Sequence, residues 1–197
     1  MKNLIMSSFL IVPMVFLSSC SSTTKSNEKV ISRINNLNER PAWLDESRSF
    51  LIKDGKVVSL GMTTVPGDSR VEAAFRIAES DAKRNITSAI QQKLSYVFQI
   101  AEEGTSIDSN QVQAISTEAS KRTTSHIQPD QRYWEKVVIP KENGQSEIRY
   151  RVFATVTMPE HEFKKAVSDA LTNNKTKISA DLAQKADLEW KKISEEQ

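Results

Sequence analysis

One long amphipathic run, residues 69–99, constrains this sequence more than any other stretch. Its apolar residues recur at intervals of three or four without a break: Val71, Phe75, Ala78, Ala82, Ile86, Ile90, Leu94 and Val97. That spacing predicts one helix of about 30 residues, roughly 45 Å long at about 1.5 Å per residue. Charged and amide side chains occupy the other side, so we expect the helix to lie on a sheet with one face in water.

Two β-hairpins flank this helix in the sequence. In the first, an Asp-Gly turn separates residues 50–52 from the run 57–65, and in the second an Asn-Gly turn joins residues 133–139 to residues 148–158. We therefore predict an α+β fold: a two-layer domain whose antiparallel sheet of two β-hairpins packs on the long helix, with a C-terminal helical extension. Gly61, inside a strand, indicates a bulge or a close crossing of that helix.

The remaining segments give weaker signals. Residues 111–125 permit a weak helix or an edge strand, and we favour the helix. Val30, Ile34 and Leu37 lie at helical spacing and fit a short docking helix, although Asn35, Asn36 and Asn38 favour a frayed segment. A helix begins at Pro159, and a second one follows it with a thin apolar stripe. Such a stripe fits either the edge of the domain itself or a helix that awaits a partner.

The first nineteen residues are typical of a secretory signal. Lys2 gives a positive start, and residues 4–17 form an apolar core that is too short to span a bilayer comfortably. The run Leu-Ser-Ser-Cys that ends at Cys20 resembles the bacterial lipobox, in which cleavage before the cysteine leaves a lipid-modified N-terminus. Cys20 is the only cysteine, so an internal disulfide is excluded. The alternative is a secretory signal with an incidental cysteine.

This signal divides the chain into four expected parts. They are a lipoprotein signal peptide (1–19), a lipid-anchored linker (20–39), the α+β domain (40–175) and the C-terminal helical extension (176–197). We expect lipidated Cys20 to hold the mature protein on the membrane. Ser21 stands where an aspartate favours inner-membrane retention in enterobacterial lipoproteins, so the resemblance implies the outer membrane, with the domain facing the periplasm.

The composition offers little material for a chemical site. The net charge is only +2, and Lys and Arg are dispersed among acids, so we expect no nucleic-acid partner. The two histidines, His126 and His161, share no ligand-like spacing, so no metal site is expected. Ser69 follows a Gly-Asp pair as in GDS-type esterases, but Arg70 and the lack of an aspartate three residues before His161 favour a capping serine. We therefore predict neither an enzyme nor a cofactor.

Four side chains are candidates for binding. Trp43 follows Pro41 and fits an anchor on the rim of the domain or a binding aromatic. Arg149 and Arg151 lie on the polar face of the last strand, which is also what a solvated face looks like. Phe153 interrupts that face, so it is either a second-layer contact or part of a partner surface.

A resemblance to a known family follows from packing residues. The sequence has Pro41-Ala42-Trp43-Leu44, then a strand ending in Leu60-Gly61, then a helix with Ala73-Ala74, Ala78, Ala82 and Asn85-Ile86. This order resembles the LPP-twenty family of bacterial membrane-associated lipoproteins, over about residues 40–158. The resemblance implies a small α+β domain on an outer-membrane lipid anchor, and some relatives are flagellar lipoproteins that build a disc or ring. The long extension beyond Lys175 departs from the family.

Two functions follow as expectations. The first is a structural lipoprotein that self-assembles or docks on an envelope machine, with a flagellar-motor disc or ring as the expected case. Its partners are then further copies of the chain or envelope and flagellar proteins. The alternative is an envelope binding module for peptidoglycan or a small ligand, which needs a concave pocket with convergent polar groups.

Overall fold

The computed structural model describes residues 28–101, 109–141, 143–173 and 179–195, and it has an α+β fold. The elements follow in this order: β1 (Lys29–Arg33), a 3-10 turn η1 (Ile34–Asn36), α1 (Ala42–Glu46), β2 (Leu51–Lys53), β3 (Lys56–Pro66), α2 (Val71–Ala101), α3 (Ser109–Thr124), β4 (Gln128–Pro140), β5 (Ser146–Pro159), α4 (Glu160–Asn173) and α5 (Ala180–Glu195). The predicted long helix, both hairpins and the weak helix before β4 are confirmed.

The strands form one antiparallel sheet in the order β1-β4-β5-β3-β2. The two hairpins, β2-β3 and β4-β5, join through β3 and β5, which pair over the whole length of β3 from Lys56↔Pro159 to Pro66↔Arg149. The prediction of one sheet built from two hairpins is therefore confirmed. The sheet also has a fifth strand, β1, on its β4 edge.

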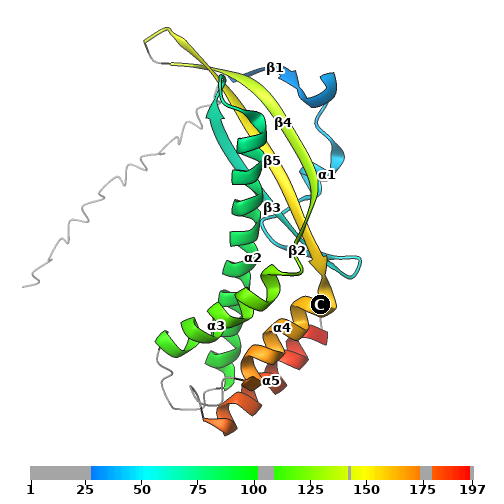
Figure 1. Ribbon diagram of the computed structural model, residues 1–197, viewed down its shortest axis with the longest axis vertical. Coiled ribbons are helices and arrows are strands. Elements are labelled where there is room, and N and C mark those ends of the chain that lie inside the picture. The colour runs from blue at the N-terminus through cyan, green and yellow to red at the C-terminus, as the bar shows by residue number, and fades with distance from the viewer. Residues whose placement is uncertain (1–27, 102–108, 142, 174–178, 196–197) are drawn as a thin grey trace, which may run out of the picture.

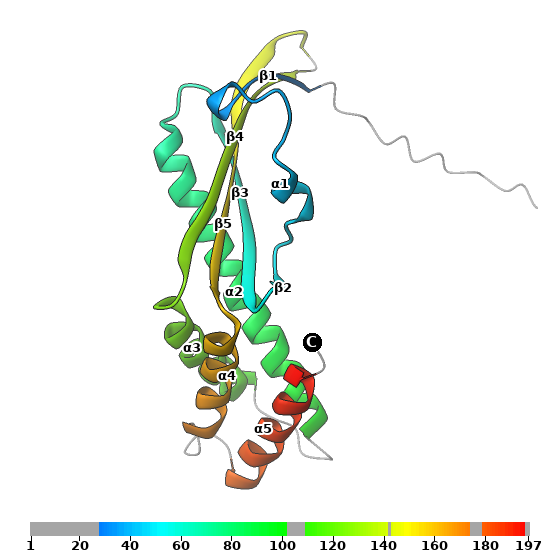
Figure 2. The same cartoon turned by 90° about the vertical axis from the view of Figure 1, so that its right-hand side faces the viewer.

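The molecule is elongated, and α2 runs along most of its length (Figure 1). The first part of α2 covers one face of the sheet, and the small helix α1 lies on the opposite face (Figure 2). The later part of α2 extends beyond the strands and packs with α3, α4 and α5. The expectation that the whole helix lies on the sheet is therefore correct only for its first half.

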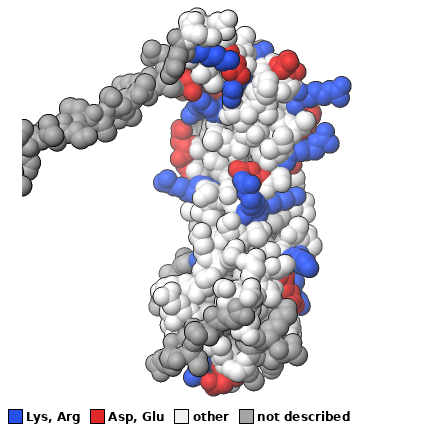
Figure 3. Space-filling view, turned by 90° about the vertical axis from the view of Figure 1, so that its left-hand side faces the viewer, with Lys and Arg blue, Asp and Glu red and all other residues white. Residues whose placement is uncertain are grey.

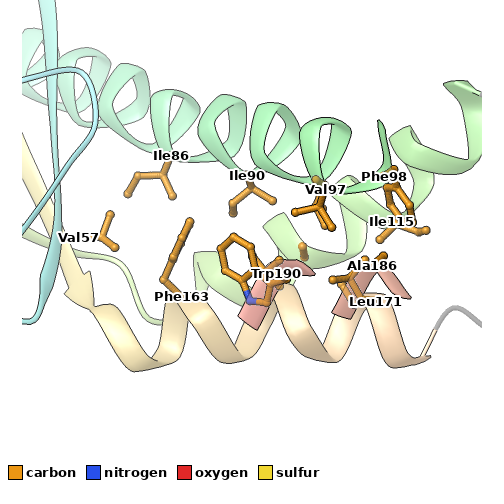
Figure 4. Packing of buried hydrophobic residues seen from close by; sticks show 14 of the residues in the cluster. Val57, Ile86, Ile90, Val97, Phe98, Ile115, Phe163, Leu171, Ala186 and Trp190 are labelled. Carbon is orange, nitrogen blue, oxygen red and sulfur yellow. The ribbon is translucent and has the colours of Figure 1, made fainter. Parts of the chain in front are cut away.

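The predicted apolar stripe of α2 contributes to both of the core clusters that lie along the helix. Near the start of α2, Phe75 packs against Val152 and Ala154 of β5. Further along, Ile86 points toward Val57 and Phe163, while Ile90 points toward Trp190 of α5 (Figure 4). The same periodic stripe thus serves the sheet first and the helices afterwards. Its members from Phe75 onward are buried, most of them with 0–1% exposure.

Gly61 marks a close crossing of β3 and α2, one of the two alternatives that the sequence left open. A Cβ placed on Gly61 would overlap the carbonyl oxygen of Ala78 and the backbone nitrogen of Ala82. The backbones can approach this closely only without a side chain. Beside this crossing, the side-chain amide of Asn85 donates a 2.9 Å hydrogen bond to the carbonyl of Leu60, which satisfies a backbone group at the edge of β3.

The structure places the segment before residue 40 differently from its sequence expectation. Val30, expected in a docking helix within the linker 20–39, lies in β1 and pairs with Val137. Val and Ile at positions 30 and 31 favour a strand, and Asn35 and Asn36 then take positive φ angles of 53° and 55° that turn the chain. The sheet therefore begins before residue 40.

The C-terminal extension is part of the domain rather than an appendage. Ala183, Ala186 and Trp190 of α5 are buried in the main core cluster, and the indole N–H of Trp190 donates to the carbonyl of Lys164 at 3.2 Å. The thin stripe of this helix covers the edge of the domain itself, so the domain does not end at residue 175. Within the described residues, no helix is long and apolar enough to cross a membrane.

Candidate functional site

Most of the sequence-predicted binding residues gather on the face of the sheet opposite α2. Two of them, Arg151 and Phe153, lie on β5. Strand pairing places Glu135 of β4 opposite Arg151 and Tyr133 of β4 opposite Phe153. Successive residues of a strand alternate between faces, so these four side chains share one face. The short helix α1 and the turn η1 cover this face.

The centre of the group is the buried carboxylate of Glu135, which is 0% exposed. Arg40 holds it in a two-pronged contact, with Nε donating to Oε2 at 3.0 Å and the second nitrogen to Oε1. Arg151 donates to Oε1 at 3.1 Å, and the hydroxyl of Tyr133 lies 3.3 Å from Oε2. A buried charge is stable only when it is paired and hydrogen-bonded in this way.

The electrostatics of Glu135 reflect this balance. Burial alone would raise the pKa of its carboxyl, but the hydrogen bond and charge of Arg40, aided by those of Arg151, bring the pKa below its usual range. The same contact raises the pKa of Arg40. Burial and the nearby carboxylate raise the pKa of Tyr133. Glu135 is therefore a charged group at neutral pH.

The same cluster also contacts the N-terminal segment that begins at Glu28, a few residues after the predicted anchor Cys20. Arg151 also forms an ion pair with Glu28, the first described residue. Next to it, β1 pairs with β4 from Lys29↔Val138 to Arg33↔Glu135. The Arg33 side chain donates to the carbonyl of Asn38 at 2.7 Å. Ion pairs and strand pairing thus hold the segment from residue 28 to residue 40 against the sheet, and we call this arrangement the N-terminal clamp.

An aromatic layer lies beside the clamp. The rings of Tyr133 and Phe153 have centroids 6.0 Å apart, and Leu44 and the half-buried Trp43 pack onto them. The guanidinium of Arg40 lies over the ring of Phe153 at 5.9 Å. Phe153 is only 7% exposed, so it makes a second-layer contact, which was one of the two alternatives left open.

Arg149 stands apart from this cluster. Its Nε donates to Glu147 at 2.8 Å, and Lys141 contacts the same carboxylate at 3.1 Å. The structure therefore brings Trp43, Arg151 and Phe153 together but leaves Arg149 on the outer part of the β4-β5 hairpin. Both nominated arginines contact carboxylates, Arg149 that of Glu147 and Arg151 those of Glu28 and Glu135. Cys20 lies outside the described residues.

Sequence reasoning missed Glu135, Arg40 and Tyr133 as site residues. One signal for Glu135 was present: it lies between Tyr133 and Val137 at the buried phase of an alternating strand, where a charge needs a partner. The partner Arg40 is 95 residues away in sequence. No local pattern indicates that pair.

The chemistry of the cluster is that of a structural joint. The acceptor atoms of Glu135 face the donors of Arg40, Arg151 and Tyr133, so its carboxylate is engaged within the group. Both histidines lie near the carboxylate of Glu162, away from this cluster. The Nε2 atom of His126 is 3.5 Å from one carboxylate oxygen, and the Nε2 atom of His161 is 3.3 Å from the other. Across the residues that the structure describes, no set of three or more His, Cys, Asp or Glu is placed to hold a metal ion.

Comparison with known proteins adds no assignment to this geometry. No family model, no curated protein and no solved structure matches the chain.

Proposed function

We propose that this chain is an outer-membrane-anchored structural lipoprotein that self-assembles or docks on an envelope machine. Lipidated Cys20 is its membrane anchor, and the domain faces the periplasm. The lipobox-like run and the resemblance to LPP-twenty lipoproteins support this address. The expected case is a disc or ring associated with the flagellar motor.

The N-terminal clamp is the observation that carries the proposal. Only residues 21–27 separate the proposed anchor, Cys20, from the clamp, which begins at Glu28. A span of this length reaches at most about 28 Å when fully extended. The domain is therefore held close to the bilayer, and any pull on the anchor acts directly on the sheet through β1 and Arg151. A binding module that moves freely on a flexible linker would not need its linker to be held against the sheet in this way.

The surface also supports association with other molecules. Met62 and Ile77 are 53% and 52% exposed and line one hollow between β3 and α2. Ile100 and Leu188 are 41% and 50% exposed and line another between α2 and α5. Exposed apolar side chains that lie together favour protein contacts. Two patches at different places on one elongated subunit suit an assembly with repeated contacts.

The test combines membrane attachment with assembly. Cys20→Ser should release the protein from the outer-membrane fraction or leave an uncleaved precursor, whereas the control Ser22→Ala should behave as wild type. Crosslinking in intact cells, followed by light scattering of the detergent-extracted protein, should recover oligomers or complexes with envelope proteins. A strictly monomeric protein from which no envelope partner is recovered would contradict the structural role. Fluorescent fusions that spread evenly, away from flagellar bases, would contradict the motor assignment alone.

A further inference from the structure

A second feature, independent of the anchor and the clamp, lies between α2 and α3 in the helical half. The two helices border a hollow of about 480 Å³, which an adjoining hollow of about 190 Å³ extends along α3. Gln91 and Gln113 line both parts, so the two hollows adjoin at this pair of glutamines. The larger hollow alone falls within the range of about 300–1,000 Å³ for small-molecule sites. We call the two hollows together the α2–α3 groove.

Uncharged polar side chains border this groove from both helices. On α2, Thr87, Gln91, Ser95 and Gln99 recur every four residues and form one stripe. On α3, Gln113, Thr117, Ser120 and Thr124 form the facing stripe. Among the described residues that line the groove, one is charged, Lys121. Figure 3 views this side and shows charged side chains mainly over the sheet half, while the described surface of the helical half is largely uncharged.

Helix stability does not explain this composition. Ser, Thr and Asn compete with the backbone for hydrogen bonds and are poor helix formers. Exposed helix positions more often carry Glu, Lys or Arg, which support the helix and keep the surface soluble. Thr117 and Thr124 nevertheless occupy exposed positions, and their hydroxyls donate back to the carbonyls of Gln113 and Ser120 at 2.8 Å and 2.7 Å. The groove therefore has these residues at the expense of helix propensity.

The hydrogen-bonding groups match a ligand rich in hydroxyls. The amides of Gln91 and Gln113 share one bond of 2.7 Å across the groove, and each amide keeps a further donor or acceptor for another molecule. The threonine oxygens, whose protons are used by the helix, remain acceptors. A sugar hydroxyl both donates and accepts. Neutral donors and acceptors outnumber the single charged side chain, Lys121, among the groove residues that the structure describes, and such a mixture suits sugar hydroxyls.

The same features disfavour a protein partner in the groove. Protein interfaces depend on aromatic, large apolar or arginine anchors at their centre. Here Phe98 is 1% exposed and belongs to the core, and Val112 is half-buried and packs against the same core. Neither offers the protruding contact that a docking helix or a second copy needs.

We propose that the α2–α3 groove binds a neutral oligosaccharide through its amide and hydroxyl side chains. The ligand class is an uncharged glycan segment of a few sugar units. This activity goes beyond the proposed structural role and requires neither the lipid on Cys20 nor self-assembly. In an envelope protein it would add a second, weak attachment at the end of the molecule away from the N-terminal clamp.

The experiment titrates oligosaccharides into the full-length protein, purified in a zwitterionic detergent without a sugar head group. Chitotetraose and maltotetraose are the neutral probes, and a uronic-acid tetrasaccharide is the anionic comparison. Calorimetry and saturation-transfer NMR measure binding. Saturable binding of either neutral probe supports the proposal, and a preference for chitotetraose assigns the ligand to acetamido sugars such as those of cell-wall glycan.

Matched variants locate the site. The double variant Gln91→Ala/Gln113→Ala should weaken binding about tenfold, the effect of losing about 1.4 kcal/mol of hydrogen bonding. Alanine is a better helix former than glutamine, so the variant should stay folded. Gln92→Ala removes an exposed glutamine next to Gln91 that does not line the groove, and it should bind as wild type. Thr117→Val, which keeps the side-chain shape, should weaken binding several-fold.

Three results would overturn the proposal. The first is the absence of binding to both neutral tetrasaccharides, and the second is binding of the anionic one alone. The third is equal binding by the double variant and by Gln92→Ala, because the ligand would then lie elsewhere. A double variant that keeps its affinity for sugars but changes the oligomer size in light scattering would assign the groove to a second copy instead.

Discussion

Replacing Glu135 with Gln tests the N-terminal clamp at its most buried group, the carboxylate of Glu135. The change keeps the shape of the side chain but removes the charge that Arg40 and Arg151 share. Breaking a buried ion pair costs about 3–5 kcal/mol when the remaining charge stays out of water. Here the side chains of Arg40 and Arg151 are 39% and 23% exposed and can regain water. We therefore expect the lower end, about 3 kcal/mol.

Thermal unfolding followed by circular dichroism measures this loss. For a chain of this size, about 3 kcal/mol lowers the midpoint by about 6–12 °C. Glu147→Gln is the matched control, because it makes the same change on the same hairpin at a carboxylate near the surface, and its midpoint should hardly move. A double-mutant cycle with Arg40→Gln should give a coupling energy of about 1–3 kcal/mol. A loss below about 1 kcal/mol for Glu135→Gln would refute the reasoning.

Three further predictions concern the fold and its pH dependence. Gly61→Ala should destabilise the domain by about 3 kcal/mol or more, because the new methyl meets the backbone of Ala78 rather than a movable side chain; chemical denaturation measures the loss. Trp190→Ala should cost about 3–5 kcal/mol, since the indole is 2% exposed and its ring centroid lies 6.1 Å from that of Phe163; a variant that melts like wild type would mean that α5 is detachable. The folded pKa of Glu135 is lowered, so its contribution to stability is present above the unfolded pKa of about 4.3 and is lost as the pH falls through the folded value. An acid titration of stability should therefore be shallower in Glu135→Gln than in wild type below about pH 4.3.

The parts of the fold that follow from local sequence could be predicted. The stripe from Val71 to Val97 repeats at the helical period, and this period alone places the buried face of α2. The Asp-Gly and Asn-Gly turns fix both hairpins. Gly61 in a strand indicated a bulge or a close approach, because a glycine there weakens the strand. The structure decides for the close approach.

The parts that depend on distant partners could not. Val30, Ile34 and Leu37 fit a helical spacing, and the β-branched Val30 and Ile31 fit a strand. Pairing with the edge of β4 decides between the two. Arg40 and Glu135 meet because the order of strands in the sheet brings them together. Neither the partner of a buried charge nor the register of an edge strand is written in the neighbouring residues.

The candidate site shows the same division. The sequence nominated Trp43, Arg151 and Phe153, and they lie together on one face of the sheet. The period-two alternation of β5 explains this success for Arg151 and Phe153. Glu135, which organises the cluster, was overlooked because a single acid in a strand resembles any solvated residue. Its position between Tyr133 and Val137, on the buried side of the alternating strand, distinguishes it.

Mass measurement of the N-terminal peptide tests the central claim, that this domain is a lipid-anchored structural protein, most directly. Cells are labelled with a fatty-acid analogue, the protein is extracted from the outer membrane, and the N-terminal peptide is analysed. The account predicts a peptide that begins at Cys20 and carries acyl chains on that residue. A peptide with a free thiol, or one that begins at another residue, would contradict the anchor and the structural role that depends on it.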